Sequence, residues 1–158
     1  MNLRAEALAA IDDTRKFFDR TTSVLTEADS GFRATPETMS VASMVAHVAQ
    51  TLDWFRRGAL ANDWRLDFEV LTAETDAVTS LAEARRWLAR AFAELRTAVE
   101  AASDADLATD LPDNPILPGR PRYNAIQSIV DHTAHHRGAL AVYARLLGRV
   151  PPMPYVEG

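Results

Sequence analysis

Three of the chain's four histidines lie within residues 131–138, inside a longer stretch with helical periodicity. His132 and His136 are four positions apart, so on a helix they project from the same face, one turn apart. Two imidazoles at that spacing can bind one divalent metal ion without distorting the backbone. The fourth histidine, His47, lies in another helical stretch. If these two helices are neighbours, three imidazoles form one site.

The apolar seam of residues 123–147 separates the clustered histidines. His136 lies on that seam, four positions before Leu140, and His132 follows Ile129 by three positions, so both are predicted to face inward. His135 belongs to a more polar stripe, which indicates a surface position or a place beside the ligands. The pair His132 and His135 also has a permitted spacing and stays an alternative. Spacing alone also allows these histidines to be ordinary polar residues at the edge of a core.

A metal held by three neutral nitrogen ligands has coordination positions left open, which is typical of a catalytic site. The chain has no cysteine, so disulfides, thiolate nucleophiles and thiolate ligands are excluded. Zn²⁺ or Ni²⁺ suits imidazole ligands, whereas Fe²⁺ or Mn²⁺ more often adds a carboxylate. A water or thiol at the open position would have its pKa lowered, and a carbonyl would be polarised.

Four side chains near these histidines could take part in the site, and three of them also have a second interpretation. Asp53 and Asp131 could accept the second ring N–H of a ligand histidine, although Asp131 could equally face solvent. Arg137 could bind an anionic group of a substrate, or it could be a solvated surface arginine. Trp54 lies on a face near His47, where it could line a pocket or pack at the edge of the core.

Four segments have the apolar spacing of amphipathic helices, and they must position these side chains. Ser40 is a predicted N-cap, and Ser80 with Glu83 forms a predicted capping box. Almost no strand signal accompanies them, which predicts an all-α four-helix bundle, a single domain over residues 1–158. The four helices are expected at residues 3–25, 40–61, 81–102 and 123–147.

The connections between these helices are less regular. Residues 63–79 contain aromatic side chains but no clear period, which predicts a partly packed loop, with a short helix at most, that could cover the site. Residues 104–110 could add one helical turn. Residues 111–122 contain four prolines, a density that no helix or central strand tolerates, so we expect an ordered crossing loop.

Composition narrows the class of protein. The chain has 158 residues, 47% of them apolar and 25% charged, values that suit one globular domain. A net charge of −5 and the lack of a basic cluster argue against a nucleic-acid partner. No signal-like segment and no long apolar run are present, so we expect no membrane association and a cytoplasmic location.

Three motifs in order resemble those of the DinB/YfiT-like family, and the resemblance covers nearly the whole chain. Residues 39–47, Met-Ser-Val-Ala-Ser-Met-Val-Ala-His, are similar to a Trp-Ser-apolar run that ends in His-Leu. The other two are His-Thr-Ala-His-His-Arg-Gly at residues 132–138 and Arg-Leu-Leu-Gly at residues 145–148, followed by two prolines. Met39 stands where the family commonly has tryptophan, and Ala139 where it often has glutamine.

The resemblance implies a four-helix bundle with a long crossover, often a homodimer, with a divalent metal, commonly zinc or nickel, on His47, His132 and His136. Relatives include S-transferases and isomerases that use bacillithiol or mycothiol, and others have no assigned reaction. We therefore expect a metal-dependent enzyme that activates a low-molecular-weight thiol or water and acts on a small-molecule substrate. The alternative is a non-catalytic stress-response protein with a structural metal. An open pocket at the site would favour the enzyme, and a sealed site the alternative.

Overall fold

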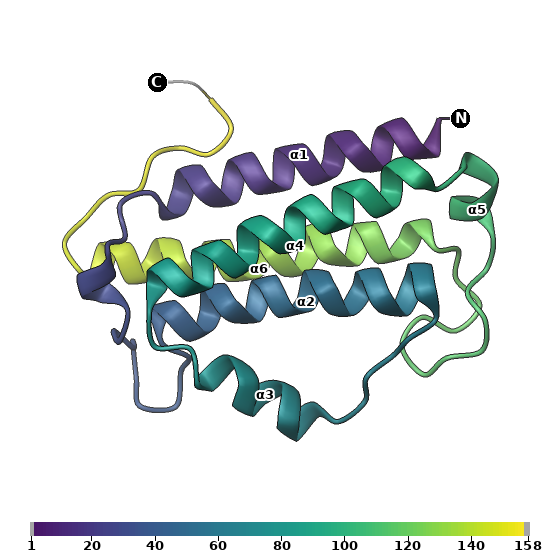
Figure 1. Cartoon of the computed structure of the whole chain (residues 1–158). Helices are drawn as coiled ribbons and strands as arrows, with labels where there is room; N and C mark the ends of the chain where they lie inside the picture. The colour runs from purple at the N-terminus through teal and green to yellow at the C-terminus, as the bar shows by residue number, and fades with distance from the viewer. Residues whose placement is uncertain (1, 157–158) are drawn as a thin grey trace.

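The computed structural model describes residues 2–156 of the chain. Within that range the only extended pairing is an isolated bridge between Asp110 and Pro121, so the predicted all-α class is confirmed. The ends of the predicted domain, residue 1 and residues 157–158, lie outside the described residues. Four long helices form a bundle, and three short ones join them (Figure 1): α1 (Leu3–Thr22), the 3-10 turn η1 (Glu27–Asp29), α2 (Val41–Ala61), α3 (Phe68–Asp76), α4 (Leu81–Ala101), α5 (Asp104–Ala108) and α6 (Tyr123–Leu146).

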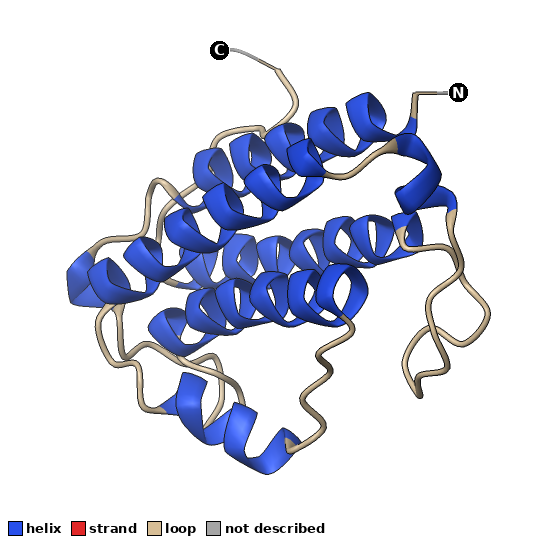
Figure 2. Ribbon diagram, turned by 45° about the vertical axis from the view of Figure 1, so that its right-hand side comes forward, coloured by secondary structure: helices blue, strands red, loops and turns tan. Residues whose placement is uncertain are grey.

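Helices α1 and α6 run one way along the bundle, and α2 and α4 run the other way (Figure 1). α2 packs against α4 and α6, and α1 packs against α6 and α4. Because α2 and α4 are parallel, the chain between them must return along the length of the bundle. It does so through α3, which lies outside the four-helix bundle and packs beside α2 (Figure 2).

The long crossover is therefore the connection between α2 and α4. The prediction that residues 111–122 cross the bundle is wrong, because α4 ends and α6 begins at the same end (Figure 1). The prediction that this proline-rich loop is ordered agrees with its bonding. The side-chain oxygen of Asn114 accepts the N–H groups of Ile116 and Leu117 at 3.0 and 2.8 Å, and its amide donates to the Pro112 carbonyl at 2.8 Å.

The core is built from the predicted apolar seams of the long helices. Burying one aliphatic side chain contributes about 1.5–3 kcal/mol relative to leaving it exposed, so each seam fixes the rotation of its helix about its own axis. That rotation decides which way the histidines of α2 and α6 point. Fully or almost fully buried members include Ile11, Phe18, Val48, Leu52, Leu88, Leu95, Ile129 and Leu140.

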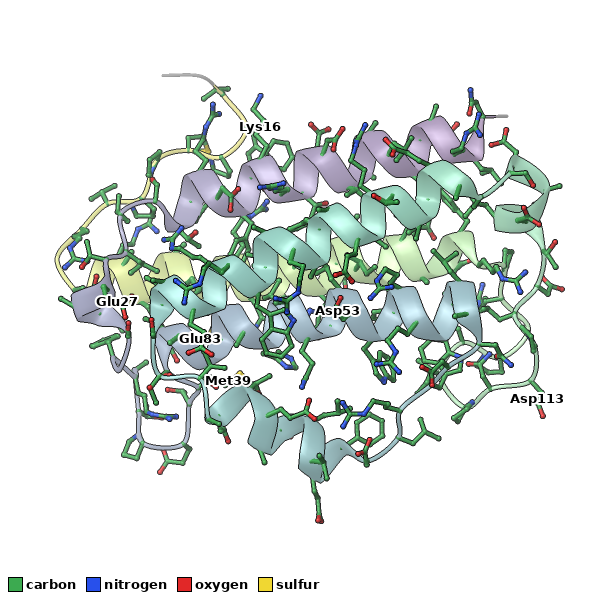
Figure 3. All side chains as sticks on the ribbon, in the orientation of Figure 1. Lys16, Glu27, Met39, Asp53, Glu83 and Asp113 are labelled. Atoms are coloured by element: carbon green, nitrogen blue, oxygen red, sulfur yellow. The ribbon has the colours of Figure 1, made fainter. Side chains whose placement is uncertain are left out.

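The predicted caps are found at the starts of α2 and α4. The hydroxyl of Ser40 accepts the Ser43 N–H at 3.1 Å, and that of Ser80 accepts the Glu83 N–H at 3.2 Å. Among the described residues, Glu83 does not complete the predicted capping box. Glu27 from η1 reaches the start of α4 instead (Figure 3), where its carboxylate accepts the Ala82 N–H at 2.7 Å.

The C-terminal end of α1 differs from its predicted position, and that of α6 agrees with it. α1 stops at Thr22 rather than residue 25, because the chain tightens there: the Ser23 and Leu25 N–H groups donate to carbonyls three residues back, those of Arg20 and Thr22, at 3.4 and 3.0 Å. α6 ends as predicted before Gly148, whose φ of 77° is in the left-handed region that favours glycine. The expected extra turn is α5. No helix among residues 2–156 combines the length and the hydropathy of a membrane span.

Candidate metal centre

His47 of α2 meets His132 and His136 of α6. The Nε2 atoms of His47 and His132 are 3.0 Å apart. One ring nitrogen from each of the three histidines lies within 4.8 Å of the other two. The three ring centroids are separated by 4.5 to 4.9 Å. The structure therefore brings together the three imidazoles that the sequence selected, in a cluster compatible with a metal site.

The donor set and the spacing both fit a divalent ion. Zn–N bonds of about 2.0–2.1 Å in a tetrahedral site place two ligand nitrogens about 3.3 Å apart. The 3.0 Å between the Nε2 atoms of His47 and His132 is close to that value. All three histidines are half-buried, and the group contains no carboxylate. A small shift of either ring would admit the ion.

The environment keeps these imidazoles neutral. Burial is the largest cause that lowers the pKa of His47, of His132 to about 4 and of His136 to about 3. The neighbouring imidazoles lower the pKa of His132 and His136 further, since two positive rings so close would repel. At neutral pH each ring therefore offers a free nitrogen lone pair, as metal binding requires.

Asp53 does not support the histidines in the way that the sequence suggested. Its carboxylate accepts the indole N–H of Trp87 at 2.8 Å and lies 3.4 Å from Arg56. Asp53 is six positions after His47, so on a helix it points about 120° away from that ring. It therefore lies on the side of α2 that faces α4 (Figure 3).

The other proposed neighbours also have other surroundings. Asp131 and His135 are exposed, so Asp131 takes the solvent-facing alternative. The partner of His132 in the cluster is His136 and not His135. The Nδ1 atom of His132 is buried with no hydrogen-bond partner among the described residues. Arg137 is neither an anion anchor at the site nor simply solvated, since it donates to the Tyr155 hydroxyl at 2.8 Å and lies over the ring of Phe17.

Two of the clustered histidines, His47 and His132, line a cavity of about 300 Å³ between α2, α3 and α6. The connection at residues 63–79 does cover the site, because α3 forms one wall. Trp54 lines the cavity, which supports the first of its two interpretations. The complete lining is Met39, His47, Gln50, Thr51, Trp54, Phe55, Phe68, Leu71, Thr72, Thr75 and His132.

Several of these residues were not selected from the sequence. The hydroxyl of Thr51 lies 3.4 Å from the Nε2 atom of His132, and its place four residues after His47 could have revealed it. The wall residues of α3 gave no such signal, because nothing in their own periodicity relates them to a histidine on another helix.

A sequence model of the DinB superfamily matches residues 6–140, a range that contains all three clustered histidines. The chain belongs to the DinB superfamily. The family resemblance is thus confirmed; the first two motifs lie inside the match, and the third, at residues 145–148, lies beyond it.

Two solved structures share the fold of this DinB-superfamily chain. A conserved protein from Enterococcus faecalis superposes with a TM-score of 0.67 at 20% identity, over 93% of this chain and 97% of that one. A DinB-like protein from Bacillus cereus ATCC 10987 has a TM-score of 0.64 at 19% identity, over 92% of this chain and 91% of that one. Comparison with curated proteins gives no match. At these identities the two structures support the fold alone.

Proposed function

We propose that this DinB-superfamily protein is a metal-dependent enzyme whose ion, Zn²⁺ or Ni²⁺, is held by His47, His132 and His136. The observation that carries the proposal is the convergence of three neutral imidazoles beside an open cavity. A divalent ion bound there supplies Lewis acidity, which lowers the pKa of a thiol or water at its open position. The proposed reaction is transfer or isomerisation with a low-molecular-weight thiol, or hydrolysis with water.

The residues around the cluster have separable roles in this proposal. The three imidazoles bind the ion, and burial keeps them unprotonated. The Thr51 hydroxyl lies beside His132 on the cavity side, where it can form a hydrogen bond to a group at the open position. The wall from α3 limits the access of bulk water.

The cavity also favours the enzyme over the non-catalytic alternative. A structural metal site is closed by four protein ligands, whereas a cluster of three histidines beside about 300 Å³ of space leaves room for a substrate. The net charge of −5 supports a small molecule rather than a nucleic acid as the partner. A homodimer and a cytoplasmic location complete the proposal and rest on the family resemblance and on the sequence alone.

Metal analysis of the purified protein tests the ligand set. We expect stoichiometric Zn²⁺ or Ni²⁺ in the wild type and at least a tenfold loss of affinity in His136→Ala, because two imidazoles cannot replace three. His135→Ala is the matched control, since that ring is exposed and adjacent, and it should keep the metal. A wild type without metal, or full retention in His136→Ala, would contradict the ligand assignment.

Turnover is tested with the metal-loaded protein and a panel of thiols and electrophiles, each electrophile also without thiol. Loss of free thiol measures transfer, and conversion of the electrophile measures isomerisation and hydrolysis. The chain has no cysteine, so it adds no background to a thiol assay. Activity should require the metal and should be lost in His47→Ala. A protein that binds the metal and consumes no substrate, thiol-dependent or hydrolytic, would favour the non-catalytic alternative.

A further inference from the structure

The cavity beside the histidines is mostly apolar. Most of its exposed wall surface is apolar, and five of its eleven lining residues are aromatic or aliphatic. The other six are two histidines, one glutamine and three threonines. No aspartate, glutamate, lysine or arginine is among the residues that line it. A charged ligand group would lose its hydration there without meeting an opposite charge.

The polar wall residues have already used much of their hydrogen-bonding capacity. The Gln50 amide nitrogen donates to the Leu71 carbonyl at 2.9 Å and to the Glu74 carboxylate at 3.0 Å. The Thr75 hydroxyl donates to the Thr72 carbonyl at 3.0 Å. These groups therefore offer little to a charged ligand.

Charged side chains do occur nearby, but they pair with one another outside this cavity. Arg65 pairs with Asp67 at 3.1 Å and with Glu74 at 2.9 Å. Arg65 and Glu74 line a separate, smaller cavity on the other side of Gln50. The charges near α3 are thus bound to each other and not directed at the histidines.

The volume sets the size of the group that fits. An apolar cavity of about 150 Å³ takes up one benzene molecule, so about 300 Å³ suits two fused aromatic rings or an aliphatic group of equal bulk. Low-molecular-weight thiols made from cysteine or sugars carry ammonium, carboxylate or hydroxyl groups. Their chemistry does not match this wall.

We propose that this cavity binds an uncharged, largely apolar group, about the size of two fused rings, of the substrate that the activated thiol or water attacks. This assignment of substrate class rests on the proposed catalytic role of the three histidines. The wall from α3 would then select the substrate by its size and its lack of charge.

Met39 is the specificity-determining residue that this assignment singles out. Its main-chain carbonyl accepts the Tyr143 hydroxyl at 3.0 Å, which fixes the backbone, while its half-buried side chain lines the cavity beside α3 (Figure 3). A methionine side chain is unbranched and adapts to irregular ligands. A larger, rigid side chain at this position would occupy the space that the ligand needs.

Calorimetric titration with 2-naphthylmethanol, beside its anionic counterpart 2-naphthoate, tests the proposal on the full-length chain. Both metal-loaded and metal-free protein are titrated, and the charge comparison uses the metal-free form because a carboxylate could bind the ion. We expect saturable binding of the neutral probe to both forms. The anion should bind at least tenfold more weakly to the metal-free protein.

Two cavity-filling variants localise the binding. Met39→Trp and Thr72→Trp should each weaken 2-naphthylmethanol at least tenfold, and Thr72 is exposed on α3, so its replacement carries little risk to folding. Met153→Trp is the matched control, because Met153 is 60% exposed on the C-terminal segment, and it should bind as the wild type does. Thermal melts confirm that each variant is folded.

Absence of saturable binding in both forms, equal affinity for the anion, or unchanged affinity in both filled variants would overturn the proposal. These outcomes are independent of metal analysis. A protein that binds the naphthyl probe but no metal contradicts the proposed function and still supports the apolar binding site. A protein that binds metal but not the probe contradicts only the apolar site.

Discussion

At the scale of single residues, the candidate centre depends on the effect of burial on the pKa of its imidazoles. An exposed imidazole is partly protonated near neutral pH, whereas desolvation lowers the pKa of His132 to about 4 and of His136 to about 3. A proton and a metal ion compete for the same lone pair. Burial weakens the proton as a competitor and leaves the rings available to an ion.

The convergence of these three histidines could be predicted from the sequence, but their neighbours could not. His132 and His136 share a face by helical geometry, and the seams of α2 and α6 fix the inward direction. Asp53 and Trp87, by contrast, are joined across α2 and α4. A pairing of that kind depends on the relative rotation and offset of two helices, which no periodicity within one helix specifies.

Asp53→Ala should lower stability without affecting metal content. The substitution leaves the part-buried indole N–H of Trp87 without its acceptor, which costs about 1–3 kcal/mol. Denaturant unfolding and metal analysis measure the two effects separately. Asp131→Ala, an exposed control, should change neither. Loss of metal from Asp53→Ala would mean that this carboxylate supports a ligand histidine after all.

Asp29 should contribute to stability in a pH-dependent way. Its carboxylate, 5% exposed, accepts hydrogen bonds from Arg149 at 2.9 Å and from the Thr26 N–H at 2.7 Å. These bonds lower the pKa of Asp29 from 3.8 to about 2, with the Arg149 guanidinium the largest cause. Because the pKa is lower in the folded state, ionisation of Asp29 stabilises the fold. This stabilisation is fully present above pH 3.8 and is lost as the pH falls to about 2.

Asp29→Asn should therefore destabilise the protein by about 1–2 kcal/mol at neutral pH, since Arg149 is partly exposed and solvent screens the pair. The difference from the wild type should shrink as the pH falls toward about 2–3, where the wild-type carboxyl also becomes protonated. Urea unfolding of both proteins across this range measures it. A difference that stays constant with pH would contradict the role given to ionisation.

At the scale of elements, the long helices were predictable and α3 was not. α1, α2, α4 and α6 each bury a continuous seam that repeats with the helical period. α3 buries only Leu71 and Thr75, while Phe68 and Val70 are about half exposed. With one apolar side chain buried, its pattern is too short to register as amphipathic, so the element that walls the cavity has the weakest signal.

Gly58 and Gly138 offer a matched test of how the segment before α3 is held. A Cβ added at Gly58 would overlap the indole of Trp64, whereas nothing lies within 4 Å of one added at Gly138. Both glycines lie inside helices, where alanine gains about 0.5–1 kcal/mol. Overpacking costs about 1–3 kcal/mol, so Gly58→Ala should lower the melting temperature and Gly138→Ala should raise it. A rise in both would show that Trp64 moves aside freely.

At the scale of the whole molecule, the bundle core and the histidine cluster are separate. The buried side chains that form the core extend along all four long helices and do not include the three histidines. Small metal-dependent domains, such as zinc fingers, unfold without their ion because they have no such core. This chain is expected to fold with or without metal.

Chelator-treated protein should therefore keep its helical circular dichroism and unfold cooperatively. Added Zn²⁺ at about 100–1,000 times its Kd should stabilise it by about 3–4 kcal/mol, which raises the melting temperature by roughly 2–4 °C per kcal/mol at this size. His136→Ala should show no such rise. An unfolded metal-free protein at room temperature would contradict the separation of core and site.

His47 and His132 are 85 positions apart, and α3, α4 and α5 all lie in the chain between them. An ion bonded to both rings would act as a reversible cross-link that ties the first third of the polypeptide to its last. Because the entropy of loop closure grows only slowly with length, so long a loop is not a barrier to forming it. α3 contributes none of the three imidazoles, so a movement of that cavity wall would leave the tie in place.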